Sequence, residues 1–545
     1  PHLLRRIPEI NTLLVGYDKQ NENRKYKGAF FPTVDILKDN STYLSFGYDP
    51  FTPDNQLNYS TLHATDNISI YRDRHTYTLG ANYEYYKSNN LFFPGNNGVY
   101  VYSSLDDFYA AANGTRDSVA LFQFRYSALP EFAKPLQVLK IHRVDLYGQD
   151  EFQVSNRVKL TYGIRAGLIK FEDTGLENPT ITDQEYIDEN GVRGYKINTG
   201  KLPAAKILWE PRIGFNWDVT GKKSTQVRGG TGIFTGRPPY VWVSNQIGNN
   251  GVLTGFIQAS NSTKYPFTDN VAGMYTPDSP TLPSTFDIAG TDGSYKFPQV
   301  WKSDLAIDQK LPFGFVAMAE FLYNRNINAV RYFDANLEPS TTNFSGPDNR
   351  PRFPGSGVTG TANINNAVRI NDNVSRAAIM TTTNEGYYWG ATFKLEYPAK
   401  KGLYGMVAYT HSKARDLMSA GSIASGSWTA VRTVAGNNTL PLAYADQDLP
   451  DRTVGVLGYR LEYGGQFGGA TQISIGYVGE NRGFNASAGF NTSRFSYSIA
   501  GDMNGDGVSD NDLLFVPDQT QLSQMLFDDI KDAGGNVLFT GDQQR

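Results

Sequence analysis

Apolar and polar side chains alternate without a break over long stretches of this chain. From Val158 to Leu168 every second side chain is apolar, and Lys, Thr, Gly and Arg residues stand between them. The segments Tyr77–Tyr85 and Tyr387–Tyr397 repeat the pattern. A period of two is that of a β-strand whose two faces meet different surroundings. These strands approach the roughly 9 to 11 residues that a tilted strand needs to cross a bilayer.

The strands are joined in pairs by short turns, and the pairs are separated by long polar segments. The long segments cover residues 89–140, 171–210, 238–300 and 326–385 and are rich in Gly, Asn, Thr and Pro. A seventh hairpin is predicted to turn at 38–41, which gives about 14 strands, and residues 10–17 and 494–499 would add one or two. The six clearest turns are Arg72–Arg74, Ser155–Arg157, Thr220–Ser224, Pro312–Gly314, Pro398–Gly402 and Gly464–Gln466.

Regular alternation of short turns and long loops places all turns at one end of the strands and all loops at the other. An outer-membrane barrel has this layout, with periplasmic turns and extracellular loops. Aromatic residues near strand ends, such as Trp217, Trp301 and Tyr397, suit a girdle at the membrane boundary. The sequence therefore predicts an all-β fold, a transmembrane antiparallel β-barrel. The alternative is a secreted soluble β-protein, for example a carbohydrate-active enzyme, which would be released without detergent.

Composition and residue spacing argue against nucleic-acid binding and catalysis. The formal net charge of -4 gives no polycationic surface, and the absence of cysteine removes thiolate chemistry and disulfides. Asp150 and Glu151 are strand neighbours whose side chains point to opposite faces, so they cannot share a substrate. We therefore expect that this chain is not an enzyme. The histidines are scattered without ligand spacing: His2, His63, His75, His142 and His411.

Several segments match known sequence motifs in their residues and in the order in which they occur. Residues 144–165, read as VDLYGQDEFQV followed by LTYGIR, and residues 211–234, read as PRIGFNWDV followed by VRGGTGIF, resemble consecutive strand pairs of TonB-dependent outer-membrane receptors. Residues 448–452 resemble a DxPHR re-entry motif, with Asp451 where the family has His. Together with GRPPYVW at 236–242 and DMNGDG at 502–507, the likeness is to the Oar-like subgroup of Bacteroidota and myxobacteria.

The resemblance implies a barrel of about 22 strands that encloses an N-terminal plug. It also implies a TonB-contacting box and, in many members, a carboxypeptidase-regulatory-like domain ahead of the plug. No such N-terminal part is recognisable here, and the chain starts at Pro1 without an initiator Met. Residues 1–545 are therefore interpreted as the barrel domain, cut at both ends.

The function implied by the resemblance is capture of an external solute and its import through the plugged barrel. Expected partners are TonB with its inner-membrane energising complex, outer-membrane lipids, and a surface lipoprotein or other outer-membrane proteins. The expected location is the bacterial outer membrane, with extracellular loops. The alternative function is an adhesion or scaffold component of an outer-membrane assembly. The solute stays open, with a mild preference for peptide or protein cargo.

One acidic segment has the pattern of a calcium loop. Oxygen-bearing side chains at positions 1, 3 and 5, followed by glycine at position 6, let a chain wrap a hard cation. Position 12, where a bidentate Glu belongs, is Leu513, so the expected Ca²⁺ site is weak. The alternative is an acidic turn without an ion. The predicted ligands are Asp502, Asn504, Asp506, Asp510 and Asp512.

Aromatic residues in the long loops allow two interpretations. Tyr240, Trp242 and Trp428 would either bind a ligand at the barrel mouth or pack the loops against one another. The sequence does not separate these alternatives.

Overall fold

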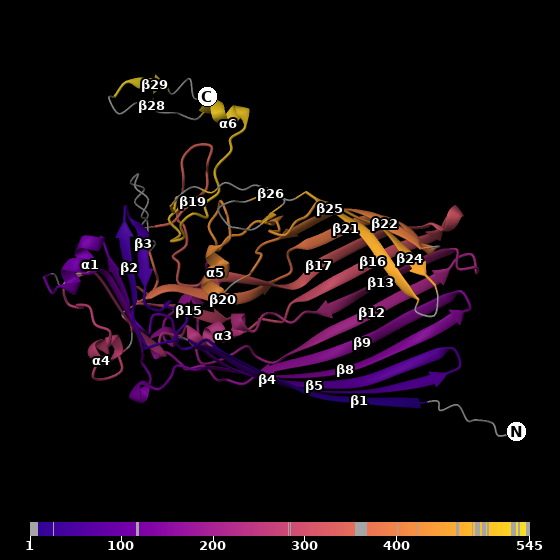
Figure 1. Ribbon diagram of the computed structural model, residues 1–545, viewed down its shortest axis with the longest axis horizontal. Helices are drawn as coiled ribbons and strands as arrows, with labels where there is room; N and C mark the ends of the chain where they lie inside the picture. The colour runs from indigo at the N-terminus through magenta and orange to yellow at the C-terminus, as the bar shows by residue number, and fades with distance from the viewer. Residues whose placement is uncertain are drawn as a thin grey trace.

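The computed structural model contains a 16-stranded sheet, of which thirteen strands form a curved wall (Figure 1) and three pair outside that path. The structure describes residues 9–25, 27–115, 119–281, 283, 285–354, 368–400, 402–421, 423–464, 468–481, 483–484, 491–492, 498, 501–524, 530–531 and 535–540. In spatial order the wall runs β1 (Glu9–Asn23), β4 (Asn55–Arg72), β5 (His75–Phe92), β8 (Gln137–Ser155), β9 (Val158–Phe171), β12 (Lys206–Asp218), β13 (Thr225–Thr235), β16 (Gln299–Lys310), β17 (Val316–Asp334), β21 (Tyr387–Lys400), β22 (Leu403–Asp416), β24 (Asp451–Tyr463) and β25 (Gly469–Glu480).

Neighbouring wall strands are antiparallel and follow one another in the chain, as the hairpin pattern predicts. The six clearest hairpins are confirmed, and their turns lie together at the right-hand end in Figure 1. The wall is open, because β1 and β25 do not pair with each other within the described residues. None of the described helices is long and apolar enough to cross a membrane. The all-β fold class is confirmed.

The predicted strand count changes at one hairpin. The hairpin at 38–41 exists, but β2 (Thr33–Lys38) and β3 (Ser41–Phe46) pair outside the wall, in a separate sheet. The additional strand at 10–17 is confirmed as part of β1, whereas 494–499 lies outside the described residues apart from Ser498. The 38–41 turn misleads because a hairpin signal reports local geometry and not the sheet that the hairpin joins.

The register separates an apolar face from a polar one. Leu79 pairs with Gly148, which pairs with Ile164, and Ile164 is 50% exposed, as expected for a side chain that faces lipid. On the other face Asn82 pairs with Asp145, which pairs with Gly167. Loop residues pack on this second face of β5, where the Tyr86 ring contacts the Tyr240 ring. The second face is therefore the lumen.

Three long connections build a second sheet beyond the wall, at the left of Figure 1. Its order is β14 (Thr254–Ser262), β7 (Val119–Ser127), β6 (Val99–Tyr102), β2 and β3, and β2 runs parallel to β6. It has its own core, which includes Val34, Ile36, Tyr100, Phe122 and Phe124. Helices α1 (Leu105–Ala112) and α4 (Val271–Tyr275) lie beside it. We call this unit the loop sheet.

A larger apolar core fills the mouth of the wall. It joins the loop-side ends of β8, β9 and β12 to α3 (Val241–Gly248), α5 (Ala424–Thr429), β15 (Phe286–Thr291) and β20 (Val374–Thr383). The long loops are thus folded over the lumen. Short elements complete the chain: η1 (Pro130–Phe132), α2 (Pro179–Thr182), β10 (Tyr186–Ile187), β11 (Arg193–Tyr195), η2 (Pro312–Gly314), β18 (Thr342–Asn343), β19 (Pro351–Arg352), β23 (Ala443–Tyr444), β26 (Gly483–Phe484), β27 (Asn491–Thr492), α6 (Gln519–Gln524), β28 (Ile530–Lys531) and β29 (Val537–Phe539).

Candidate functional site

A cavity of about 590 Å³ lies on the lumen side of the mouth. One wall comes from lumen-facing side chains of β4 and β5, among them Tyr59, Tyr86 and Ser88. The other comes from the segment that follows β13, including Arg237 and Tyr240. Its volume is within the range of small-molecule sites. We call it the mouth cavity.

The segment after β13 turns into the lumen for reasons that its sequence supplies. Pro238 and Pro239 lack the N–H that a wall strand must donate, so β13 stops before them and α3 begins soon afterwards. Arg237 then forms an ion pair with Glu84, whose side chain is largely buried. The Arg237 guanidinium also lies 5.6 Å from the centre of the Tyr240 ring. These contacts hold the segment against β5.

Three tyrosines make the mouth cavity aromatic. The rings of Tyr59 and Tyr86 are 5.9 Å apart between centroids, and those of Tyr86 and Tyr240 are 4.7 Å apart. The Tyr59 hydroxyl donates to Gln20 Oε1 at 2.6 Å. Burial raises the pKa of Tyr240 to about 12, so its hydroxyl stays protonated at neutral pH. The site combines flat ring faces, hydroxyl groups and an ion pair, which suits a polar organic solute.

The lumen below the mouth cavity carries paired charges. Asp145 is 0% exposed, and its Oδ2 lies 3.0 Å from Arg143 Nε and 2.6 Å from Arg165 Nη2. Asn82 donates a further hydrogen bond to the same oxygen at 3.0 Å. A second network joins Arg228 on β13 to Asp308 on β16 and Glu320 on β17. The interior is therefore polar, as in barrels that pass or hold hydrated groups.

The structure assigns different roles to the loop aromatics. Tyr240 lines the mouth cavity. Trp428 is fully buried, donates from Nε1 to Asn438 Oδ1 at 3.0 Å and stacks under Arg376, so it packs loops together. Trp242 is half-buried against the mouth core. Sequence reasoning missed Tyr59 and Tyr86 as site residues; their lumen-facing parity on β4 and β5 was the available signal.

The acidic segment at 502–512 folds into a buried turn. Asp502, Asn504, Asp506 and Asp512 lie together and are shielded from solvent, whereas Asp510 is exposed. Their oxygens accept hydrogen bonds from the segment's own backbone: Gly505 and Gly507 donate to Asp502, and Met503 donates to Asp512 at 2.7 Å. Within the described residues, no group of three or more His, Asp or Glu side chains is arranged to hold a metal ion. The Ca²⁺ site stays a prediction.

Burial and the proximity of like charges raise the pKa values of Asp502 and Asp506. Burial, with the neighbouring Asp512 charge as a smaller cause, raises the pKa of Asp502 to about 6. Burial and the charges of Asp502 and Asp512 raise the pKa of Asp506 to about 7. The Arg350 guanidinium approaches Asp512 to 3.9 Å and offsets part of the negative charge. The turn therefore carries net negative charge that grows as pH rises through the neutral range.

The protein family described as "Outer membrane beta barrel domain" matches residues 8–490. No curated protein sequence matches the chain. Among solved structures, the outer membrane transporter YddB from Escherichia coli is similar at 10% identity, over 87% of this chain and 53% of that one, with a TM-score of 0.45. The FrpB iron transporter from Neisseria meningitidis is similar at 12% identity, over 75% of this chain and 41% of that one, with a TM-score of 0.38.

The siderophore receptor PirA from Acinetobacter baumannii is similar at 10% identity, over 86% of this chain and 53% of that one, with a TM-score of 0.37. The chain thus spans about half the length of these structures.

Proposed function

This chain belongs to the outer membrane beta barrel domain family, and we propose that it forms the wall and mouth of a TonB-dependent transporter of the Oar-like subgroup. As a member of that family it is an integral protein of the bacterial outer membrane. In the proposal an external solute binds in the mouth cavity. TonB and its inner-membrane complex then act on a plug supplied by the rest of the parent protein, and the solute passes along the polar lumen. The chain itself performs no catalysis.

The mouth cavity is the observation that carries this proposal. A structural wall protein has no need for an extracellular segment folded into its lumen, fixed by the ion pair of Arg237 and Glu84, and lined with tyrosines. Beneath it, the networks around Asp145 and Arg228 keep the interior polar. Capture at the mouth followed by passage through a polar interior is the sequence of events that this layout supports.

The test uses the full-length protein in its own host. Depletion of solutes from a defined mixture of peptides and siderophores is followed by mass spectrometry for the wild type, a deletion strain and a strain lacking TonB. We expect depletion in the wild type alone. A Tyr86→Ala/Tyr240→Ala variant should deplete the solute at least about tenfold more slowly, since each tyrosine ring that packs on the solute contributes roughly 1 kcal/mol. Equal depletion without TonB would contradict energy-dependent import.

A second function, adhesion or scaffolding in an outer-membrane assembly, is favoured by one observation. The loop sheet ends in the edge strand β3, where Tyr43 and Leu44 are exposed. Exposed apolar side chains on an edge strand suit a protein contact. Gentle detergent extraction followed by affinity capture of the full-length protein distinguishes the two functions. Stable stoichiometric capture of a lipoprotein or another barrel, lost in Tyr43→Asp and unaccompanied by import, would favour the scaffold.

A further inference from the structure

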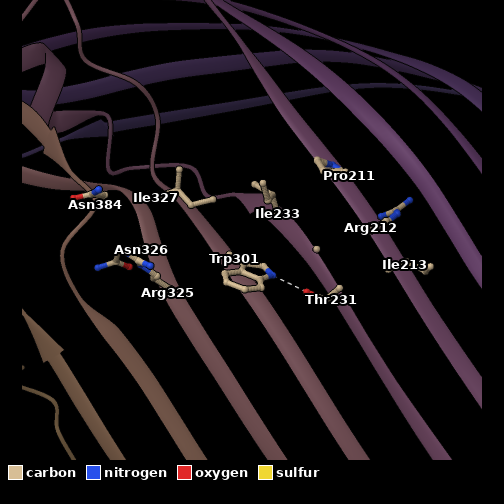
Figure 2. A pocket seen from close by; sticks show the side chains of 11 residues that line it. Pro211, Arg212, Ile213, Thr231, Ile233, Trp301, Arg325, Asn326, Ile327 and Asn384 are labelled. Atoms are coloured by element: carbon tan, nitrogen blue, oxygen red, sulfur yellow. Dashed lines mark hydrogen bonds between the residues drawn. The ribbon is translucent and has the colours of Figure 1, made fainter.

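The outer face of the wall carries a groove of about 560 Å³ near the loop end of β12, β13, β16 and β17 (Figure 2). Its lining is mainly apolar and includes Ile213, Ile233, Trp301 and Ile327. Two arginines also line it: Arg325 lies at its edge, and Arg212 neighbours Ile213 on β12, where it alternates with the outward-facing residues. We call it the wall groove.

The register explains both the hollow and its direction. Ile213 pairs with Thr231, Thr231 with Ser303, and Ser303 with Tyr323. Paired residues share a face, so two short side chains lie between two large ones and leave space above the sheet. The lumen residues Arg228 and Asp308 alternate with this set and point the other way. The wall groove therefore opens towards lipid.

Trp301 forms one side of the wall groove in a fixed orientation. Its Nε1 donates to Thr231 Oγ1 at 2.6 Å, as Figure 2 shows, and its ring lies edge-on to the Tyr323 ring. An indole with a satisfied N–H at the loop end of a wall strand is typical of the membrane–water boundary. The wall groove thus begins at the outer boundary and extends into the depth of acyl chains.

The residues that pair with Trp301 across successive strands form a row along the wall, and this row, which we call the cation row, includes cations. Trp301 pairs with Arg325, Arg325 with Tyr387, and Tyr387 with Arg415. Arg325 and Arg415 are thus two strand spacings apart, or about 10 Å. Lys413, which pairs with Trp389, lies on the same face, and the cations of Arg415 and Lys413 lie 4.6 and 5.6 Å from the Tyr444 ring centre.

These cations lack acidic partners. Within the part of the chain that the structure describes, no ion pair joins a carboxylate to Arg325, Lys413 or Arg415. Asp451, on the same face of β24, already accepts from the Tyr409 hydroxyl at 2.6 Å and contacts His411 at 2.9 Å. Cations at a membrane boundary attract anionic headgroups, by about 1 kcal/mol per Lys or Arg near the surface.

We propose that the wall groove and the cation row form a binding site for a phosphate-bearing lipid of the outer leaflet. One acyl chain lies against Ile213, Ile233 and Trp301. Arg325 and Arg415 donate to phosphate oxygens, for which the planar guanidinium is well suited. The occupant is a lipid and not a free anion, because the cations adjoin an apolar groove that opens into the bilayer. This site is independent of solute import.

The test is native mass spectrometry of the full-length protein in detergent, with a phosphorylated lipid A, its dephosphorylated form and inorganic phosphate as probes. We expect the phosphorylated lipid to bind at least about tenfold more tightly than the dephosphorylated one. Arg325→Gln/Arg415→Gln should remove this difference, whereas Thr231→Leu, which fills the wall groove, should weaken both lipids. Lys302→Gln is the matched control, because Lys302 neighbours Trp301 on β16 but faces the lumen.

Each other outcome overturns the proposal. Equal binding of the two lipids would mean a nonspecific acyl surface, and binding of inorganic phosphate as strong as that of the lipid would mean a free anion site. Folding of each variant is checked by its heat-dependent migration in SDS. If the double variant does not fold, Arg415→Lys, which keeps the charge but not the planar fork, must weaken the phosphorylated lipid selectively; unchanged binding would overturn the site.

Discussion

Arg237, just after β13, forms an ion pair with Glu84 on β5, four strands away along the wall. The pair fixes the segment that lines the mouth cavity, so Glu84→Gln should loosen it. A partly exposed pair contributes about 1 kcal/mol, or roughly a fivefold change in the opening equilibrium. Because the chain has no cysteine, Ser244→Cys supplies a single thiol in the cavity, and its maleimide labelling should become roughly fivefold faster.

The matched control for that experiment is Glu320→Gln. It breaks a lumen ion pair with Arg228 but does not touch the segment after β13. Its labelling rate should equal that of the Ser244→Cys parent. Equal acceleration in both variants would mean that the loss of any lumen charge loosens the barrel as a whole.

Removal of the Asp145 carboxylate should destabilise the wall severely. Asp145→Ala leaves Arg143 and Arg165 without their shared, fully buried partner, which costs about 3 kcal/mol or more. The denaturation midpoint of the folded barrel in detergent, read from heat-dependent gel migration, should fall clearly. Asp308→Ala, which removes a more exposed partner of Arg228, should cost only about 1 kcal/mol. Similar losses would contradict the distinction by burial.

Two substitutions to lysine on β9 test which face of the wall meets the lumen and which meets lipid. Ile164 points outward from β9, and Thr161 points into the lumen with Arg165. Ile164→Lys places a charge in hydrocarbon and should cost about 2–4 kcal/mol, whereas Thr161→Lys should be nearly neutral. Refolding yield into lipid vesicles at increasing urea measures both. The reverse order would exchange the two faces.

The acidic turn at 502–512 should be pH-sensitive when metal is removed. The pKa of Asp506 is raised to about 7 in the folded protein, so the folded state binds its proton more tightly than the unfolded state does. Stability is therefore greatest at low pH and falls as pH rises from about 4 through about 7. In EDTA, amide exchange of residues 501–513, corrected for intrinsic rates, should be faster at pH 8 than at pH 5. Asp506→Asn should flatten this dependence.

The same measurement tests the Ca²⁺ prediction. A cation bound by Asp502, Asp506 and Asp512 would neutralise the charge that accumulates at pH 8. Calcium at about 1 mM, the concentration range of weak extracellular sites, should restore protection of the wild type, and Asp506→Asn should respond less. Magnesium at the same concentration is the control for ionic strength. No response to calcium would leave an acidic turn without an ion.

The wall could be predicted because the sequence signals that specify its strands and turns come from residues close together in the chain. Period-two alternation identifies a strand, and a tight turn identifies the strand with which it pairs. β8 and β9, which are joined at Asn156 and Arg157, are an example. The Arg72–His75 turn closes with Asp73 in the left-handed region, at φ +52°, a conformation that a short polar side chain tolerates. Such signals need no knowledge of distant residues.

The loops could not be predicted because their partners are distant in sequence. The parallel pairing of β2 with β6, and of β15 with β20, joins segments from different connections, which no turn signal records. For the same reason the local turn signal at 38–41 predicts a wall hairpin, whereas β2 and β3 pair in the loop sheet. Tyr240 was singled out from the sequence, but its contact with Tyr86 depends on the folded path of the segment after β13.

The loop sheet has a consequence for how the long connections can move. Its strands come from three connections, the ones before β4, before β8 and before β16, and they share main-chain hydrogen bonds. No one of these connections can swing away without breaking a ladder held by the others. The three connections are therefore expected to move together, with one collective barrier and not three separate hinges. A disulfide within the loop sheet would hold the three connections together without touching the barrel.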